Sequence, residues 1–375
     1  MQSKPAVSRA KAYLKARQKH VRDALKQLKL DGLLLTHPAD LAYLTNFSGE
    51  DSVGLITEKD FVLITDFRYV EQAQQEAGWL KMVLREGKMA DAVATALADA
   101  KMNRVGFEVN FTTFGQVHSI DKAAKDLRPI EMVPLEDVMV NIRKVKDDHE
   151  VDLIRKSCAI AEEAFEAIRS EIQEGQTENY LAGLLVFELR SRGASGSSFP
   201  VIVAAGPNSS LPHYRPGENL VVRDQPLLID WGAVYDGYCS DLTRTLMIGR
   251  VGNRMKQIYK TVLDAQQAAI KFLRPGVTTR QADQVARDVI ADAGFAKEFG
   301  HGLGHGIGRD IHEMPSMRKN GGEEELKPGM IVTVEPGIYL PGEGGVRIED
   351  DVLITHSGCE LLTSLDRSLE GCHIE

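Results

Sequence analysis

The sequence predicts an α/β domain with a mixed sheet, followed by an α+β domain that contains two similar halves. In the first third of the chain, short apolar runs alternate with helical stretches, a pattern typical of an α/β layer. The segment near residues 141–149 is polar and charged, and it indicates a domain boundary. The remainder reads twice as helix, helix, strand and hairpin. We therefore expect the second domain to be a repeat about a pseudo-twofold axis.

The first domain, residues 1–143, is expected to alternate strands with helices. Strands are predicted where apolar and β-branched residues lie between turn residues, at residues 32–36, 54–57, 61–65 and 105–108. Helices are predicted where apolar residues recur at steps of three and four, at residues 68–77, 90–100 and 114–127. A basic amphipathic helix precedes them, with one apolar face formed by Leu14, Val21, Leu25 and Leu28. The domain lacks a Gly-x-Ser-x-Gly nucleophile motif, and we expect no catalytic centre in it.

The second domain, residues 144–375, is expected to begin with a long helix near residues 150–171, because its apolar residues recur at steps of three and four. Gly175 would end this helix, and Thr177 is the expected N-cap of the next one. The first half then comprises helices at 150–171 and 177–192, a strand at 199–204, and a hairpin of residues 226–232 and 237–249. The second half comprises helices at 253–272 and 279–293, a strand at 299–308, and a hairpin of residues 329–340 and 346–355.

Composition excludes several classes of protein. A chain of 375 residues with 43% hydrophobic and 26% charged residues is ordinary for two globular domains, so wholesale disorder is excluded. A formal net charge of −9 disfavours a nucleic-acid partner bound through a basic surface. No apolar run approaches the roughly 18 residues of a membrane span, so no membrane partner is expected. The basic N-terminal helix is interpreted as a cap on the first domain rather than as a transit peptide or a docking segment.

The cysteines indicate a reducing compartment. Four are present and widely spaced, without a Cys-x-x-Cys pair: Cys158, Cys239, Cys359 and Cys372. This is neither a disulfide framework nor a zinc-finger pattern, and it predicts a cytoplasmic protein.

Acidic residues interrupt the apolar strands of both predicted hairpins. Asp230 and Asp241 stand in the two strands of the first hairpin, and Glu335 and Glu349 stand in those of the second. Acids are disfavoured inside strands, and a lone buried carboxylate costs several kcal/mol unless it is paired or bound to metal. The alternative is that the acids mark solvated strand ends. Their placement in both repeats favours convergence on one or two divalent cations.

A glycine-rich segment supplies candidate imidazole ligands. His301 and His305 lie between glycines in Phe-Gly-His-Gly-Leu-Gly-His-Gly, and His312 follows. A histidine cluster on a surface loop is the alternative, because the segment lacks both the Gly-x-Gly-x-x-Gly order and the His-Glu-x-x-His motif. Imidazole with several carboxylates suits two Mn²⁺, Co²⁺, Fe²⁺ or Zn²⁺ ions better than a thiolate zinc site. Such ions hydrolyse amides by activating water and polarising a carbonyl.

Four motifs together resemble the pita-bread metallopeptidases, and among these Xaa-Pro aminopeptidase (aminopeptidase P) and prolidase. The motifs are DWGAVYDGYCSDLTRT, HGLGHGIGRDIHE, VEPGIY and GVRIEDD. The resemblance covers essentially the whole chain. It implies an N-terminal domain of the creatinase/prolidase type and a pita-bread catalytic domain with pseudo-twofold symmetry.

The resemblance also implies roles for individual residues. Asp230 would ligate one metal ion, Asp241 and Glu349 would bridge two, and His305 and Glu335 would bind the second. Glu335 would in addition move the proton of the attacking water. His312 would contact the substrate carbonyl or tetrahedral intermediate, and His213 the scissile region. The proline or carboxylate side of the pocket would be lined by His301, Arg347 and Tyr339. Arg347 would otherwise only balance the acids at 349–351.

The implied activity is a dinuclear metallo-exopeptidase that cleaves the bond between an N-terminal residue and proline, with a metal-bridging hydroxide attacking the scissile carbonyl. Mn²⁺ is the expected metal, with Co²⁺, Zn²⁺ and Fe²⁺ as alternatives, and the substrate is a small peptide. Family members are commonly homodimers. The nearest alternative is a prolidase restricted to Xaa-Pro dipeptides, followed by an aminopeptidase without proline specificity. A catalytically inactive binding module is disfavoured because no ligand is lost.

Overall fold

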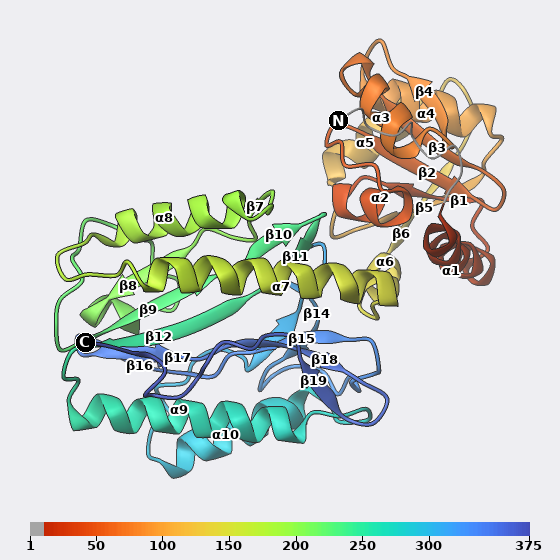
Figure 1. The fold of residues 1–375 in the computed structure, drawn as a ribbon. Coiled ribbons are helices and arrows are strands. Elements are labelled where there is room, and N and C mark those ends of the chain that lie inside the picture. Colours follow the sequence, from red (N-terminus) through yellow and green to blue (C-terminus); the bar gives the residue numbers. More distant parts are fainter. Residues whose placement is uncertain (1–10) are drawn as a thin grey trace. The chain divides into compact units, whose positions relative to one another are not determined.

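The computed structural model describes residues 11–375 and divides the chain into two compact units, residues 1–143 and 144–375 (Figure 1). The first ten residues of the basic N-terminal segment lie outside the described part. Among the described residues, no helix is long and apolar enough to cross a membrane.

The first unit is built on a six-stranded mixed sheet in the order β4-β3-β2-β1-β5-β6. Its strands are β1 (Gly32–Leu35), β2 (Val53–Thr57), β3 (Phe61–Thr65), β4 (Lys81–Leu84), β5 (Arg104–Glu108) and β6 (Glu131–Leu135). Strand β2 is antiparallel to both β1 and β3, whereas β3–β4, β1–β5 and β5–β6 are parallel. The predicted mixed sheet is therefore confirmed. Strands β4 and β6 escaped prediction because their side chains are mostly half-buried or exposed and carry no clear alternation.

Helices cover both faces of this sheet. They are α1 (Ala12–Leu28), α2 (Pro38–Thr45), α3 (Val70–Ala77), α4 (Met89–Asp99), α5 (Phe114–Ala124) and α6 (Val138–Arg143), with a 3₁₀ turn η1 (Phe67–Tyr69) before α3. Because side chains alternate along a strand, Leu33 packs in one apolar cluster with α1 and α2, and Leu34 packs in the other with α4. Leu28, predicted on the buried face of α1, is exposed because the helix ends there in a left-handed cap at Lys29.

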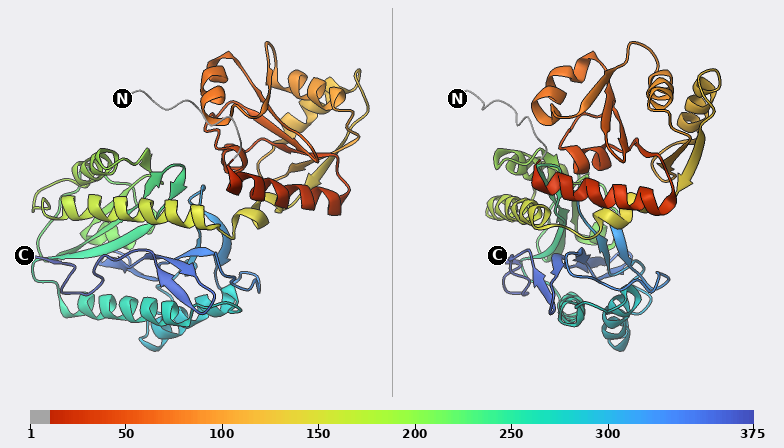
Figure 2. Two further views of the ribbon diagram at one scale, coloured as in Figure 1. Left: turned by 45° about the vertical axis from the view of Figure 1, so that its right-hand side comes forward. Right: turned by 90° about the vertical axis from the view of Figure 1, so that its right-hand side faces the viewer.

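In the second unit, two helix pairs enclose the strands (Figures 1 and 2). The pairs are α7 (Asp148–Arg169) with α8 (Glu178–Ser191), and α9 (Asn253–Phe272) with α10 (Thr279–Asp292). Helix α7 begins at a capping box formed by Asp147 and Glu150, and the predicted N-cap of α8, Thr177, accepts a bond from the amide of Tyr180. Gly175 lies in the turn before α8, with φ 86°, and not directly at the end of α7.

The strands form two main sheets, and each hairpin continues from a main sheet into a small one. One main sheet has the order β20-β12-β9-β8 and the other β14-β13-β15-β18-β19. The first contains β8 (Ile202–Ala205), β9 (Gln225–Trp231), β12 (Leu242–Ile248) and β20 (His373–Ile374). The second contains β13 (Gly304–Gly306), β14 (Glu313–Met317), β15 (Ile331–Val334), β18 (Asp350–Ile354) and β19 (Cys359–Leu361). Between their long strands, the hairpins form β10 (Ala233–Tyr235) with β11 (Tyr238–Cys239), and β16 (Gly337–Leu340) with β17 (Gly344–Arg347); β10 also pairs with β7 (Gly196–Ser197).

The repeat places only one pair of acids equivalently. Asp241 and Glu349 each stand directly before the second long strand of their hairpin. The register pairs Thr243 with Asp230, and Asp351 with Thr333, so Asp230 corresponds to Thr333. The expected equivalence of all four acids is therefore wrong. Three of them also lie at breaks between strands and not inside them, because each hairpin bends there from one sheet to the next.

Candidate active site

Three buried carboxylates from both halves of the second unit meet where the two main sheets adjoin. One oxygen each of Asp230, Asp241 and Glu349 lies within 4.8 Å of the other two. These residues are 8%, 5% and 2% exposed. The halves are joined at this point, because the Glu349 amide donates to the Thr243 carbonyl at 3.1 Å and the Thr243 hydroxyl donates to Glu349 Oε2 at 2.6 Å.

His305 and Glu335 complete the cluster. His305 Nε2 lies 3.4 Å from Glu335 Oε1 and 3.6 Å from Asp241 Oδ2. His305 Nδ1 is 3.0 Å from the carbonyl of Gly306; a carbonyl only accepts, so Nδ1 carries the proton and Nε2 faces the carboxylates. Thr333 Oγ1 accepts from the His305 amide at 3.0 Å and donates to Glu335 Oε1 at 3.1 Å. This hydroxyl fixes the positions of His305 and Glu335 relative to each other.

The electrostatics of the cluster are those of a site built for cations. Burial and the neighbouring Glu349 and Asp230 raise the pKa of Asp241 well above its ordinary value, and burial raises the pKa of Glu335 to about 7. Burial also lowers the pKa of His305 to about 4, which keeps the imidazole neutral. Four carboxylates this close cannot all ionise without a compensating positive charge.

The residues present fit divalent metal ions. Oδ1 of Asp230 is buried and has no hydrogen-bond partner among residues 11–375, although buried polar atoms are rarely left unsatisfied. The donor set of four carboxylates and one neutral imidazole nitrogen is the type that Mn²⁺, Fe²⁺, Co²⁺ and Zn²⁺ accept.

A chain of polar side chains leads away from Asp230. Arg347 Nη2 donates to Asp230 Oδ2 at 2.6 Å, and its Nη1 donates to Tyr339 Oη at 2.8 Å. His301 Nδ1 lies 2.8 Å from the carbonyl of Gly302 and must donate to it, so His301 Nε2 accepts from the Tyr339 hydroxyl at 2.8 Å. Burial raises the pKa of Tyr339 to about 12, so the phenol keeps its proton. Arg347 thus pairs with Asp230 across the two halves and not with the neighbouring acids at 349–351.

His213 and His312 lie at the exposed side of the cluster. The His312 and His305 rings meet edge to face, with centroids 4.5 Å apart. Burial lowers the pKa of His312, and the charge of nearby His213 lowers it further. The structure therefore brings both histidines close to the five ligand-type residues.

The segment that carries His213 is held by the buried carboxylate of Glu178, the first residue of α8. Glu178 is 0% exposed. Its Oε1 accepts from the Ala205 amide at 2.8 Å and from Asn208 Nδ2 at 2.9 Å. Its Oε2 accepts from Tyr214 Oη at 2.8 Å and from the Gly217 amide at 3.1 Å. These donors flank His213 on both sides, so Glu178 shapes the loop.

Sequence reasoning missed the hydroxyls that orient the acids. Thr243 and Thr333 lie in apolar strands, each two residues from an acid, and alternation places such neighbours on one face of a strand. A threonine two residues from an acid in a strand could therefore have indicated a hydroxyl near the cluster. Asp351 accepts a hydrogen bond from the Asp241 amide at 3.0 Å.

Two family models match the chain. The model of metallopeptidase family M24 matches residues 152–356, and that of the creatinase/prolidase N-terminal domain matches residues 17–145.

Relatives cover nearly the whole chain. An Xaa-Pro dipeptidase of Pyrococcus horikoshii is 33% identical over 94% of this chain and 97% of its own length. The solved structure of an Xaa-Pro dipeptidase from Bacillus anthracis is 38% identical, covers 96% of this chain and 100% of that one, and has a TM-score of 0.91. The solved structure of an X-Pro aminopeptidase from Thermotoga maritima is 36% identical, covers 92% of this chain and 99% of that one, and has a TM-score of 0.85.

Proposed function

The chain belongs to metallopeptidase family M24, with the two-domain pita-bread fold that its sequence predicts, and on this premise we propose that it releases the N-terminal residue from Xaa-Pro peptides. The observation that carries the proposal is the convergence of five ligand-type side chains from both halves of the second unit. The names of the relatives support the Xaa-Pro specificity.

The residues that would hold the metal are Asp230, Asp241, His305, Glu335 and Glu349, and Asp241 and Glu349 would serve both ions if two are bound. Mn²⁺ is the proposed metal, and Co²⁺, Zn²⁺ or Fe²⁺ would suit the same donors. Divalent ions bound there supply a water of lowered pKa and a polarised scissile carbonyl.

The protein's own groups would then handle protons and orient the substrate. Glu335, whose Oε1 lies 3.4 Å from His305 Nε2 in the cluster, would accept the proton of the attacking water and pass it to the departing proline nitrogen. His312 and His213, at the open side of the cluster, would hydrogen-bond the scissile carbonyl as its oxygen gains negative charge.

The proline side of the pocket would be formed by the Arg347–Tyr339–His301 chain. A bond before proline lacks an amide hydrogen, and its geometry is restricted. A rigid wall of hydrogen-bonded side chains suits a ring that cannot adapt, and specificity follows from differences in transition-state binding to such a wall.

A prolidase restricted to Xaa-Pro dipeptides is the second candidate, favoured by the dipeptidase relatives. It requires a group that captures the free carboxylate of the dipeptide. An aminopeptidase without proline specificity is the third. A cytoplasmic homodimer remains the proposed state of the protein.

A single set of assays distinguishes the candidates. The protein is stripped of metal, Mn²⁺, Co²⁺ or Zn²⁺ is added back, and hydrolysis of Xaa-Pro, Xaa-Pro-Yaa and Xaa-Ala-Yaa peptides is compared. We expect metal-dependent cleavage of both proline peptides and little cleavage of the alanine control. Cleavage of the dipeptide alone would establish a prolidase. Equal cleavage of the alanine peptide would contradict the proposed proline specificity. No cleavage of any peptide would refute the proposed peptidase activity.

A further inference from the structure

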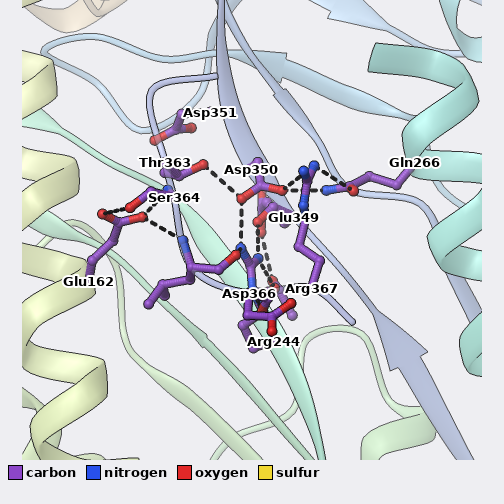
Figure 3. A network of polar contacts seen from close by, with 12 residues as sticks. Glu162, Arg244, Gln266, Glu349, Asp350, Asp351, Thr363, Ser364, Asp366 and Arg367 are labelled. Carbon is purple, nitrogen blue, oxygen red and sulfur yellow. Dashed lines mark hydrogen bonds and ion pairs between the residues drawn. The ribbon is translucent and has the colours of Figure 1, made fainter. Parts of the chain in front are cut away.

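A fully buried arginine lies directly behind the cluster of acids. Arg244, in β12, is 0% exposed, and each of its five N–H groups has an acceptor (Figure 3). Its Nη1 donates to the carbonyls of Thr243, at 2.9 Å, and Glu349, at 2.6 Å. Its Nε and Nη2 donate to the carbonyls of Asp366, at 3.1 Å, and Leu365, at 2.9 Å. One guanidinium therefore ties together both halves of the unit and a C-terminal segment.

The remaining donor of Arg244 pairs with Asp350, the residue after Glu349. Arg244 Nη2 lies 2.7 Å from Asp350 Oδ1, and the two side chains are 0% and 2% exposed. The same carboxylate accepts from Thr363 Oγ1 and Gln266 Nε2, each at 2.7 Å, and from Arg367 Nη1 at 3.4 Å (Figure 3). Asp350 thus accepts hydrogen bonds from β12, from α9 and from the C-terminal segment.

The pair fixes the backbone of Glu349 on its C-terminal side. Arg244 holds the carbonyl of Glu349, and Asp350 anchors the next residue. Arg244 also holds the carbonyl of Thr243, whose hydroxyl orients the Glu349 carboxylate. A carboxylate that would ligate metal needs a fixed position, since misplaced ligands lose metal affinity.

We infer that Arg244 and Asp350 are positioning residues that fix Glu349 for metal binding and tie the metal centre to the C-terminal segment at Thr363–Arg367. The inference rests on the proposed metal centre. Lysine cannot replace Arg244, because an ammonium has three donors and lacks the planar fork that serves five acceptors.

A merely structural pair would stabilise the domain without affecting metal affinity. A matched control is the pair Asp40–Arg143 of the first unit, which is also buried, with side chains 2% and 6% exposed and a distance of 2.8 Å. Asp350→Asn and Asp40→Asn each replace one buried carboxylate by an amide. Both variants should unfold at a lower temperature than the wild-type protein.

The test is titration of metal-stripped, full-length protein with Mn²⁺ by isothermal calorimetry. We expect Asp350→Asn to weaken Mn²⁺ binding by roughly 10–100-fold and Asp40→Asn to leave it unchanged. Thr363→Val, which removes one bond to Asp350, should weaken binding less and serves if Asp350→Asn does not fold. Wild-type affinity in both Asp350→Asn and Thr363→Val, or equal weakening in Asp40→Asn, would overturn the positioning role of Arg244 and Asp350 but leave the proposed metal centre intact. Absence of Mn²⁺ binding to the wild-type protein would overturn both the positioning role and the proposed metal centre.

Discussion

At the scale of single residues, the carboxylates of the cluster repel one another unless a cation is bound. Burial with the nearby Glu335 and Asp230 raises the pKa of Glu349 well above its usual range, as burial and neighbouring acids do for Asp241. Removing one acid therefore has opposite effects on metal binding and on the metal-free fold.

Asp241→Asn is expected to abolish activity, by about 10³-fold or more, because the variant would lack one of the proposed metal ligands and with it several kcal/mol of metal stabilisation. The stripped variant should unfold at the same or a higher temperature than the stripped wild-type protein, because an acid that burial and its acidic neighbours destabilise is replaced by a neutral amide. Activity assays with saturating Mn²⁺ and thermal melts measure the two effects. Wild-type turnover in the variant would refute the role of Asp241.

Tyr339→Phe tests the chain that leads from Asp230 to His301. The change leaves Arg347 Nη1 and His301 Nε2 without the hydroxyl between them, and an unsatisfied buried group costs about 1–3 kcal/mol. We expect a raised KM for Xaa-Pro peptides and a lower melting temperature. Tyr235→Phe, in β10, is the matched control. An unchanged KM in Tyr339→Phe would place the hydrogen-bonded side chains Arg347, Tyr339 and His301 outside the substrate pocket.

At the scale of elements, the proposed active site is built where strands and helices end. Asp241 and Glu349 occupy breaks in two related hairpins, where the chain passes between sheets. The first turn of α8 supplies Glu178, which holds the loop carrying His213. A helix end thus shapes a segment of the site far along the chain.

Glu178→Gln should lower kcat/KM by roughly tenfold, because the amide brings a donor where five donors already point and so disturbs the loop. If Glu178 acts through His213, the double variant Glu178→Gln/His213→Ala should be no slower than His213→Ala. Glu218→Gln is the control, since Glu218 lies in the same loop, is exposed, and accepts a hydrogen bond from Asn179 Nδ2 at 2.9 Å. Additive losses in the double variant would contradict the coupling.

At the scale of the whole molecule, buried protons link stability to pH. In the folded, metal-free protein, burial raises the pKa of Glu335 from 4.5 to about 7 and that of Asp351 from 3.8 to about 8. Burial lowers the pKa values of His301 and His305 from 6.5 to about 4. The histidines therefore affect stability below pH 6.5, and above it the acids with raised pKa values do, Asp241 and Glu349 along with Glu335 and Asp351.

The stripped protein should lose stability as pH rises from 6.5 to 8. In this window the folded state still holds protons on the acids that the unfolded chain has released, so the free energy of unfolding falls with pH. Asp351 alone contributes on the order of 2 kcal/mol, equivalent to about 4–8 °C in Tm. Calorimetric melts with and without Mn²⁺ measure this, and the metal should restore stability at pH 8. A rise in Tm with pH in the stripped protein would contradict the assignment.

Much of the architecture could be predicted because helices and strands leave local periodic patterns. The long helices α7 to α10 and the long strands of both hairpins lie close to their predicted ranges. Short, half-exposed elements such as β4 and β6 leave no such pattern. The equivalence of the four acids was wrong, because register is set by pairing across the sheet and not by order along the chain.

Residue types and their spacing were enough to predict the helices and strands, the family, and the order of the acids and histidines along the chain. Each of these features leaves a local pattern in the sequence. The tertiary structure decided which atoms meet. Arg347 pairs with Asp230 across 117 residues, and Arg244 reaches Glu349 across 105. Such partners share no local pattern, because packing of the two halves brings them together and only three-dimensional proximity gives each buried charge its counterpart.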